Sequence, residues 1–415
     1  MENAKDLNEV KRDIRQMNAT FAAIVGVALL FAIGCGGGSS SHSNTVTTTT
    51  GSNVQAITVN AGPAGNYANG AFTSVTVCMP GTTTCQTISG VLVDTGSPGL
   101  RLLSSALTGV SLPQQKASNG NPVVECLPFV SGVTWGPVET ADIQISGEKA
   151  SSVPVQVISG TAYPIPTACA NQGSSQDTLT ALGANGILGV GLFAQDCGDA
   201  CATTGATNPA LYYECPSSGC VVTAEVLSQQ VANPVASFPT DNNGVIVELP
   251  AASAPEATLS GSLIFGIGTQ SNNALGSATE YATDANFNFI TTYKGHAYNT
   301  SFLDSGSNEL FFLTAAISGI ATCTDATSFY CPSSTQNLSA VNQGANGVGS
   351  STVNFSVANA DSLFNSSSNT VLAELAGPNS LPGFDWGLPF FYGRNVFTAI
   401  EGKSTPGGVG PFWAY

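Results

Sequence analysis

Residues 90–97 read Gly-Val-Leu-Val-Asp-Thr-Gly-Ser, and residues 300–307 read Thr-Ser-Phe-Leu-Asp-Ser-Gly-Ser. Each stretch is a short, mostly apolar run of the residue types that strands favour, and each ends in Asp, then Thr or Ser, then Gly-Ser. Glycine directly after such a run is typical of a strand that enters a tight turn. The 415-residue chain therefore carries the same strand-and-loop unit twice.

The sequence around the two copies is duplicated as well. Each copy lies at the end of a predicted hairpin and is followed, 95 or 83 residues later, by an apolar segment that ends in glycine. The hairpins are residues 72–77 with 87–93 and residues 287–293 with 297–303, and the later segments are residues 186–189 and 384–387. One supersecondary plan thus occurs in both halves of the chain.

The composition favours short strands over long helices. Charged residues are 9% of the chain, against about 25% in ordinary soluble domains, and glycine is abundant at 46 residues. We therefore expect an all-β fold with many turns. A single helix is predicted at Thr223–Gln230, and the polar stretches 195–220 and 335–370 are predicted to be loop insertions.

The net charge excludes several classes of partner. With 10 Lys and Arg against 26 Asp and Glu, the formal charge of −16 repels nucleic-acid phosphates and anionic lipid headgroups. The two histidines, His42 and His296, are too few for a His-rich metal site, and His296 reads as a surface turn residue. We expect neither a metal nor any other cofactor, no nucleic-acid partner, and a monomer.

The N-terminus has the pattern of an export signal. Basic residues precede an apolar run of 13 residues, Phe21–Ile33, which is shorter than the ~20 residues that span a bilayer. The run ends at Gly34-Cys35, which resembles a bacterial lipobox and predicts lipidation of Cys35, although a plain signal peptide cut near Gly34 would give a similar pattern. We expect a signal peptide at 1–34, the lipidated cysteine and a flexible tether at 35–55, and lobes at 56–268 and 269–415.

The remaining ten cysteines also agree with export. Short local spacings in an oxidising compartment predict disulfides. The four close pairs are Cys78 with Cys85, Cys197 with Cys201, Cys215 with Cys220, and Cys323 with Cys331, and Cys126 and Cys169 remain to pair with each other. The alternative is a zinc site made by the four cysteines between residues 197 and 220.

The two loops predict a specific chemistry if the halves pack about a pseudo-twofold axis. Asp94 and Asp304 would then face each other, and two adjacent carboxylates hold one proton between them. One carboxylate acts as base on a bound water while the other acid protonates a carbonyl oxygen. The supporting residues, which orient the carboxylates, allow close approach or bond across to the partner loop, are Thr95, Gly96, Ser97, Ser305, Gly306 and Ser307.

These residues resemble the pepsin-like aspartic proteases, from about residue 70 to the C-terminus. Besides the two Asp loops, the segments similar to that family are residues 184–191, 261–266, 386–391 and 395–400. The resemblance implies a bilobal all-β fold with an active-site cleft between pseudo-twofold-related lobes. The combination of lipobox, tether and two lobes also resembles a family of bacterial lipoproteins known as a domain of unknown function.

The sequence departs from the family pattern near the cleft. The family has a tyrosine on a flap hairpin, but residues 123–146 contain none, so Phe129 or Trp135 would cover the substrate. Arg101 stands where the family commonly has tryptophan. It would pair with a substrate carboxylate, lower the pKa of Asp94, or lie in solvent as an ordinary strand residue.

Three functions are compatible with the sequence. The first is a lipid-anchored aspartic endopeptidase of the bacterial envelope, facing the periplasm or surface from the outer membrane, which cuts extended peptides. The second is a catalytically inactive lipoprotein that binds a peptide or an envelope protein in the same cleft. The third is a structural or adhesive surface lipoprotein, suggested by the Ser-, Thr- and Asn-rich composition. In all three, the N-terminal lipid is the only expected contact with the membrane.

Overall fold

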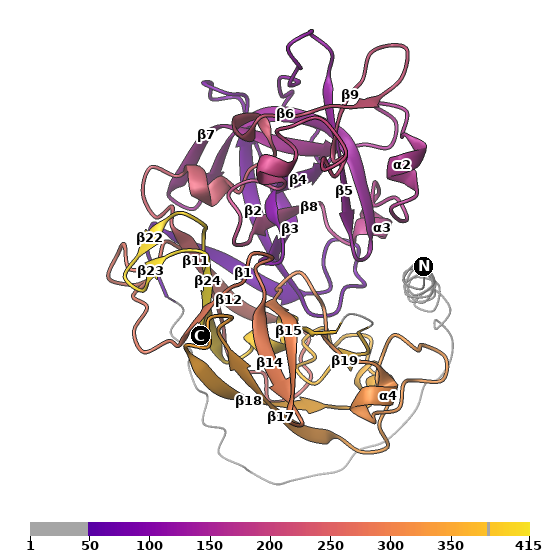
Figure 1. The fold of residues 1–415 in the computed structure, drawn as a ribbon, viewed down its shortest axis with the longest axis vertical. Helices are drawn as coiled ribbons and strands as arrows, with labels where there is room; N and C mark the ends of the chain where they lie inside the picture. Colours follow the sequence, from indigo (N-terminus) through magenta and orange to yellow (C-terminus); the bar gives the residue numbers. More distant parts are fainter. Residues whose placement is uncertain (1–48, 380–381) are drawn as a thin grey trace, which may run out of the picture.

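A computed structural model describes residues 49–379 and 382–415. The predicted signal peptide and Cys35 lie outside the described residues. In the described part, no helix has both the length and the apolar character needed to cross a bilayer. Strands dominate, and Figure 1 shows the indigo and magenta first half above the orange and yellow second half.

A sheet of fifteen strands contains most of the first half and continues into the second. In spatial order it consists of β10 (Val221–Val222), β9 (Tyr212–Glu214), β5 (Val123–Phe129), β6 (Gly132–Ile145), β7 (Glu148–Ile158), β4 (Pro98–Leu103), β8 (Gly186–Val190), β3 (Cys85–Asp94), β2 (Gly70–Cys78), β1 (Val54–Asn60), β12 (Leu259–Phe265), β11 (Gly244–Leu249), β21 (Arg394–Ala399), β24 (Phe412–Ala414) and β13 (Glu280–Ala282). The sheet curls back on itself, because β2 also pairs with β6. It crosses the predicted boundary after residue 268, since β11 from the first half pairs with β21 from the second.

A second sheet of seven strands carries the other Asp loop. Its order is β18 (Ser350–Val357), β17 (Gln336–Gln343), β14 (Phe289–Tyr293), β15 (His296–Leu303), β20 (Phe384–Trp386), β16 (Leu310–Phe312) and β19 (Ala376–Gly377). A small ribbon pairs β22 (Ser404–Thr405) with β23 (Gly408–Val409).

The helices of the described residues are single turns of three or four residues. They are α2 (Thr167–Ala170), α3 (Leu179–Leu182), α4 (Ala315–Ser318), α5 (Ala360–Leu363), α6 (Leu388–Phe391) and the 3₁₀ turns η1 (Gly198–Ala200), η2 (Leu227–Gln229) and η3 (Pro234–Ser237). None is long enough to be stable without tertiary contacts.

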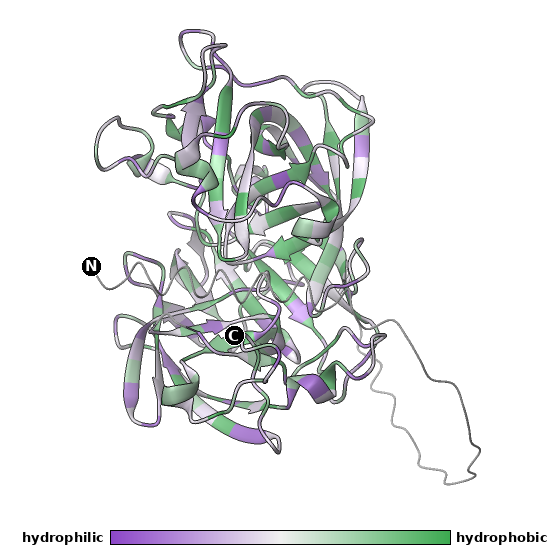
Figure 2. Cartoon of the chain, turned by 90° about the vertical axis from the view of Figure 1, so that its right-hand side faces the viewer, coloured by the Kyte–Doolittle hydropathy of each residue, from purple (hydrophilic) through white to green (hydrophobic). Residues whose placement is uncertain are grey.

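Alternation along the strands builds the core. In β1, for example, Ile57 and Val59 are buried while Thr58 between them is partly exposed. Figure 2 shows the resulting apolar residues along strands of both halves. The core of the second half is aromatic: the ring of Phe384 stacks at 5.2 Å on both Phe312 and Trp386.

Both predicted hairpins are confirmed. The first is β2 with β3, in register at Cys78 and Cys85, and the second is β14 with β15, in register at Tyr293 and His296. Each β-strand that leads to an Asp loop also pairs in parallel with the later apolar segment, β3 with β8 and β15 with β20. The duplicated sequence plan is therefore a duplicated structure.

Two predictions of secondary structure are wrong. Thr223–Gln230 is not an α-helix but a segment with the 3₁₀ turn η2 near its end, because its start continues the pairing of β10 with β9: the N–H of Thr223 donates to the carbonyl of Tyr212. The stretch 335–370 is not a loop insertion but contains the β17–β18 hairpin. The two strands of this hairpin bury apolar residues such as Ala340 and Val353. Most of the residues around them in the sequence are polar, so the alternation typical of strands is weak.

Candidate active site

Asp94 is the last residue of β3, and Asp304 directly follows β15. The two parallel pairings place them equivalently, because Val93 is opposite Leu188 and Leu303 is opposite Trp386. The structure thus brings together two carboxylates that are 210 residues apart in the chain, each at the end of a buried strand.

The two Asp loops are joined by reciprocal hydrogen bonds. The N–H of Thr95 donates to Oγ of Ser305 at 3.1 Å, and the N–H of Ser305 donates to Oγ1 of Thr95 at 2.9 Å. Each hydroxyl then donates onward to a strand of the other half, Thr95 to the carbonyl of Leu303 at 3.2 Å and Ser305 to that of Val93 at 2.8 Å. All four bonds are buried, so the loops hold each other in one geometry.

Glycine allows the carboxylates to approach the opposite loop. A Cβ added to Gly96 would lie 2.5 Å from Cγ of Asp304, and one added to Gly306 would lie 2.8 Å from Cγ of Asp94. Real Cβ atoms do not tolerate such contacts, so any other residue at either position would displace the carboxylate of the opposite loop. The N–H groups of these glycines instead donate to Oδ1 of Asp94 and of Asp304, both at 2.7 Å.

A serine holds the second oxygen of each carboxylate. Ser97 donates to Oδ2 of Asp94 at 2.5 Å, and Ser307 donates to Oδ2 of Asp304 at 2.9 Å. Burial, followed by the charge of Asp304, raises the pKa of Asp94 well above its usual value, against the opposing hydrogen bonds from Ser97 and Gly96. This is the environment in which two carboxyl groups share one proton.

Asp385 is a third acid at the site, in a segment that the sequence analysis treated only as apolar. Its Oδ2 lies 2.6 Å from Oγ of Ser307, the hydroxyl that also contacts Asp304. Burial, and next the charge of Asp304, raises the pKa of Asp385 well above its usual value. The alternation of side chains along a strand could have predicted this position. Phe384 and Trp386 face the aromatic core, so the residue between them must face the other way, toward the Asp loops.

Tyr67 is the second residue that the sequence analysis missed. It comes from the loop between β1 and β2 and not from the flap hairpin. Burial, followed by the charges of Asp304 and Asp94, raises the pKa of its hydroxyl above the usual range. Its ring packs edge-on against Phe72 at 5.4 Å. The surrounding Gly, Asn and Ala residues gave no pattern that would have marked it.

The predicted flap region forms the β5–β6 hairpin, with Phe129 opposite Gly132 next to the turn. Val130 at its tip is 77% exposed, and Phe129 is partly buried. The suggestion that Trp135 covers a substrate is wrong. Its side chain is 1% exposed and its Nε1 donates to the carbonyl of Tyr163 at 3.0 Å, within a small core under the hairpin.

Arg101 takes none of the three roles suggested for it. Its side chain is fully buried, and Nη2 donates to Oε1 of Glu125 at 2.7 Å and to Oδ2 of Asp196 at 2.9 Å. Burial, followed by the neighbouring Glu125, raises the pKa of Asp196 well above its usual value. Because Glu125 belongs to β5, the ion pair fastens the flap hairpin to β4. The partners are 24 and 95 residues away, which is why the sequence did not reveal them.

The five predicted disulfides are confirmed. They join Cys78 to Cys85, Cys126 to Cys169, Cys197 to Cys201, Cys215 to Cys220 and Cys323 to Cys331. The zinc alternative is wrong, since its four cysteines are used in two separate disulfides. The group in the described residues with a metal-like arrangement, Cys323, Cys331 and Asp361, includes two disulfide cysteines.

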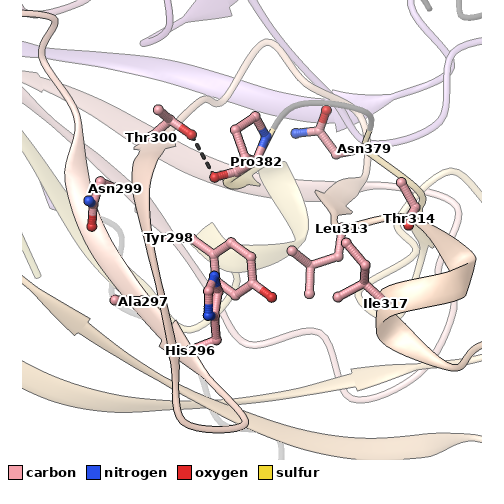
Figure 3. Close-up of a pocket in the computed structure, with 10 residues that line it drawn as sticks. All are labelled: His296, Ala297, Tyr298, Asn299, Thr300, Leu313, Thr314, Ile317, Asn379 and Pro382. Carbon is pink, nitrogen blue, oxygen red and sulfur yellow. Dashed lines mark hydrogen bonds between the residues drawn. The ribbon is translucent and has the colours of Figure 1, made fainter.

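A separate hollow of about 640 Å³ lies beside the start of β15 (Figure 3). His296 and Tyr298 form one wall and Leu313 and Ile317 another, while Thr300 donates to the carbonyl of Pro382 at 2.8 Å. The lining residues include neither aspartate of the two loops. His296 itself is exposed at the hairpin end, as a turn residue would be.

Among solved structures, the chain is similar to the crystal structure of an aspartic proteinase from Irpex lacteus. The TM-score is 0.51 and the identity 14%, and the match covers 87% of this chain and 96% of that one. The likeness confirms the predicted fold, an all-β pepsin-like architecture. No curated protein matches the sequence. The model of a family described as "Protein of unknown function (DUF3443)" matches residues 49–415, and the chain therefore belongs to this family.

Proposed function

We propose that the protein is an aspartic endopeptidase in which Asp94 and Asp304 activate a water molecule. The observation that carries the proposal is the pair of Asp loops joined by the Thr95 and Ser305 hydrogen bonds, together with the raised pKa of Asp94. A dyad needs two carboxyl groups that share one proton in a fixed geometry. The hydrogen bonds between the loops support the fixed geometry, and the raised pKa of Asp94 supports the shared proton.

The reaction follows from that arrangement. The ionised carboxylate takes a proton from the water as its oxygen attacks the carbonyl carbon, and the protonated carboxyl gives its proton to the carbonyl oxygen. One molecule of water is added to the amide, and the dyad still holds one proton. The protonated carboxyl then passes its proton to the leaving nitrogen as the carbon–nitrogen bond breaks, while the ionised carboxylate takes a proton from one hydroxyl of the tetrahedral intermediate. The products are a carboxylic acid and an amine, and the dyad again holds one proton.

The proposed substrate is an extended peptide that lies between the Asp loops and the β5–β6 hairpin. An extended chain presents backbone groups to neighbouring strand edges, and the exposed Val130 gives the hairpin an apolar tip to close over it. The Arg101–Glu125 ion pair and the Cys126–Cys169 disulfide would restrict the hairpin's movement near its base.

We further propose that Cys35 is lipidated and anchors the protein in the bacterial cell envelope as a monomer. The apolar run before Gly34-Cys35 supports this, and the five disulfides support an oxidising, extracytoplasmic location. With a net charge of −16, the protein would not be attracted to anionic membrane lipids. The lipid attached to Cys35 would therefore have to anchor it.

The test is incubation of the purified protein with a mixed peptide library from acidic to neutral pH. Cleavage that requires both Asp94 and Asp304 supports the proposal. The alternative is an inactive lipoprotein that binds a peptide in the cleft, and Asp385 favours it, because a third acid beside the pair is a departure from a two-acid site. That alternative predicts peptide binding without cleavage, and an affinity that changes little in Asp94→Asn.

A further inference from the structure

The hydroxyl of Ser307 lies between two carboxyl groups. Its Oγ is 2.9 Å from Oδ2 of Asp304 and 2.6 Å from Oδ2 of Asp385. A serine hydroxyl has one hydrogen to donate and accepts through its lone pairs. If it donates to one carboxylate, the hydrogen in the other contact must come from the carboxyl group. The geometry therefore calls for a proton on one of the two acids.

The first half of the molecule has no such third acid. There Ser97 bonds to Asp94, and the residue in the place of Asp385 is Ile187. The strand registers establish the equivalence, since Asp385 is opposite Phe302 and Ile187 is opposite Leu92, each two residues before its aspartate. Asp385 thus breaks the pseudo-symmetry of the pair on the Asp304 side alone.

The surroundings of Asp385 favour its neutral form. It is 6% exposed, and its Oδ1 has no hydrogen-bond partner. The titratable groups that face it are all acids: Asp304 and Asp94 from the two loops, and Glu309 from the segment before β16. The three salt bridges of the described residues do not include it. An unpaired negative charge on this buried carboxyl would destabilise the folded protein. Of the two acids that contact Ser307, Asp385 is therefore the one that holds the proton.

Glu309 strengthens this conclusion. It is fully buried, neither of its carboxyl oxygens has a hydrogen-bond partner, and burial followed by the charge of Asp385 raises its pKa well above the usual value. Two neighbouring buried acids without a cation oppose each other's ionisation.

We propose that Asp385 is a positioning residue that stays protonated at neutral pH and donates to Ser307, which donates to Asp304, so that the pair's negative charge stays on Asp304 and its proton on Asp94. The state of Asp385 does not depend on the proposed function. The consequence for catalysis does rest on it: Asp304 would be the base toward water, and Asp94 the acid toward the carbonyl oxygen.

The first test measures protonation directly and needs no activity. The full-length protein is labelled with ¹³C at the carboxyl carbon of aspartate, and its NMR signals are followed from acidic to neutral pH. We expect one carboxyl signal, absent from Asp385→Asn, to keep its protonated shift at pH 7. Titration of that signal near the ordinary value of about 4 overturns the proposal. If Asp385→Asn does not fold, Asp385→Glu identifies the signal, because it removes the labelled aspartate and keeps a carboxyl group.

The second test compares two substitutions of Asp385 in the peptide-cleavage assay. Asn keeps a donor toward Ser307 but cannot titrate, whereas Ile, the residue of the first half, removes the donor. We expect Asp385→Asn to keep kcat within about threefold and extend activity to higher pH, and Asp385→Ile to lower kcat by about tenfold or more, the size of one charge-assisted hydrogen bond. Equal effects on kcat with unchanged pH profiles would overturn the positioning role. If the wild type cleaves no peptide, the proposed function is wrong. The NMR experiment then still tests whether Asp385 is protonated at neutral pH.

Discussion

Thr95 and Ser305 exchange hydrogen bonds in both directions, each N–H donating to the other's hydroxyl at 3.1 and 2.9 Å. The residues come from opposite halves of the chain and are fully or almost fully buried. The pair is the direct connection between the two Asp loops, and it sets how the carboxylates face each other.

The first prediction concerns this pair. Thr95→Ala leaves the buried N–H of Ser305 without an acceptor, and we expect a loss of about 1–3 kcal/mol in the free energy of unfolding, measured with urea. Ser305→Ala should have a similar effect on the N–H of Thr95. The double variant should lose less than the sum, because the bonds belong to one network. Thr95→Ser, which keeps the hydroxyl, is the control. A loss in Thr95→Ser as large as in Thr95→Ala would contradict the role of the hydroxyl.

The second prediction concerns the two aspartates. Asp94→Asn and Asp304→Asn should each lower turnover of a cleaved peptide by at least ~100-fold, because neither carboxyl can serve as both acid and base. Folding should survive, since Asn has the same shape. Circular dichroism checks the fold and peptide cleavage checks the activity. Asp325→Asn, an exposed acid elsewhere, should cleave as the wild type does. Full activity in either dyad variant would remove the pair from the mechanism.

The third prediction concerns Arg101. Arg101→Met leaves Glu125 and Asp196 buried without a cation, and we expect a loss of about 3–5 kcal/mol of unfolding free energy. Adding Glu125→Gln should recover part of that loss. The matched control is Lys149→Met, which removes a half-exposed lysine from Asp142. The Asp142 carboxylate keeps its hydrogen bonds from the N–H groups of Gly81 and Ser152, so stability should change by at most ~1 kcal/mol. Similar losses in both single variants would show that burial of the Arg101 pair is unimportant.

The fourth prediction is a pH dependence that follows from the raised pKa of Glu309. Above the unfolded-state value of about 4.3, the folded state holds a proton that the unfolded state has lost, so this group's effect is to lower stability as pH rises toward its folded pKa. Glu309→Gln keeps the shape and removes the titration. It should gain stability over the wild type toward neutral pH, and the gain should shrink as the pH falls to about 4. Urea unfolding across this range measures the difference. A gain that is constant with pH would argue against titration of Glu309.

The fifth prediction tests the anchor. The full-length protein expressed in its native host should incorporate radioactive palmitate, and Cys35→Ala should abolish the label and release the protein from the membrane fraction. Ser39→Ala, four residues further along, should change neither. Membrane fractionation of Cys35→Ala that matches the wild type would refute lipidation as the anchor.

The fold and the two Asp loops could be predicted because their information is local. A strand followed by Asp, a hydroxyl residue and Gly is readable within eight residues, and its repetition indicated the pairing of two halves. Close cysteine spacings gave four of the disulfides for the same reason, whereas Cys126 and Cys169, 43 residues apart, were paired because they were the two that remained. Asp385 was partly readable, since the alternation of Phe384 and Trp386 already placed it on the opposite face of the strand.

The contacts that could not be predicted depend on long-range neighbours. The burial of Arg101 depends on Glu125 and on Asp196, which lies in a loop whose path no periodicity reveals. Tyr67 lies in the connection between β1 and β2, and only the folded structure places this connection close enough for the charges of Asp304 and Asp94 to act on its hydroxyl. Thr223–Gln230 had the composition of a helix, but its first residue continues the pairing of β10 with β9, with the N–H of Thr223 donating to the carbonyl of Tyr212.

The continuous large sheet also sets the order in which the molecule can be assembled as it is synthesised. Strand β1 lies near the start of the described chain, yet its neighbours β12 and β11 lead to β21 and β24 at residues 394–399 and 412–414. The strand β20, which supports Asp304, is also made late, at residues 384–386. A chain made N-terminus first would present Asp94 long before these strands, and contacts so distant in sequence form slowly. The two carboxylates would therefore meet only after nearly all of the chain has been made, which delays any hydrolytic activity until synthesis is almost complete.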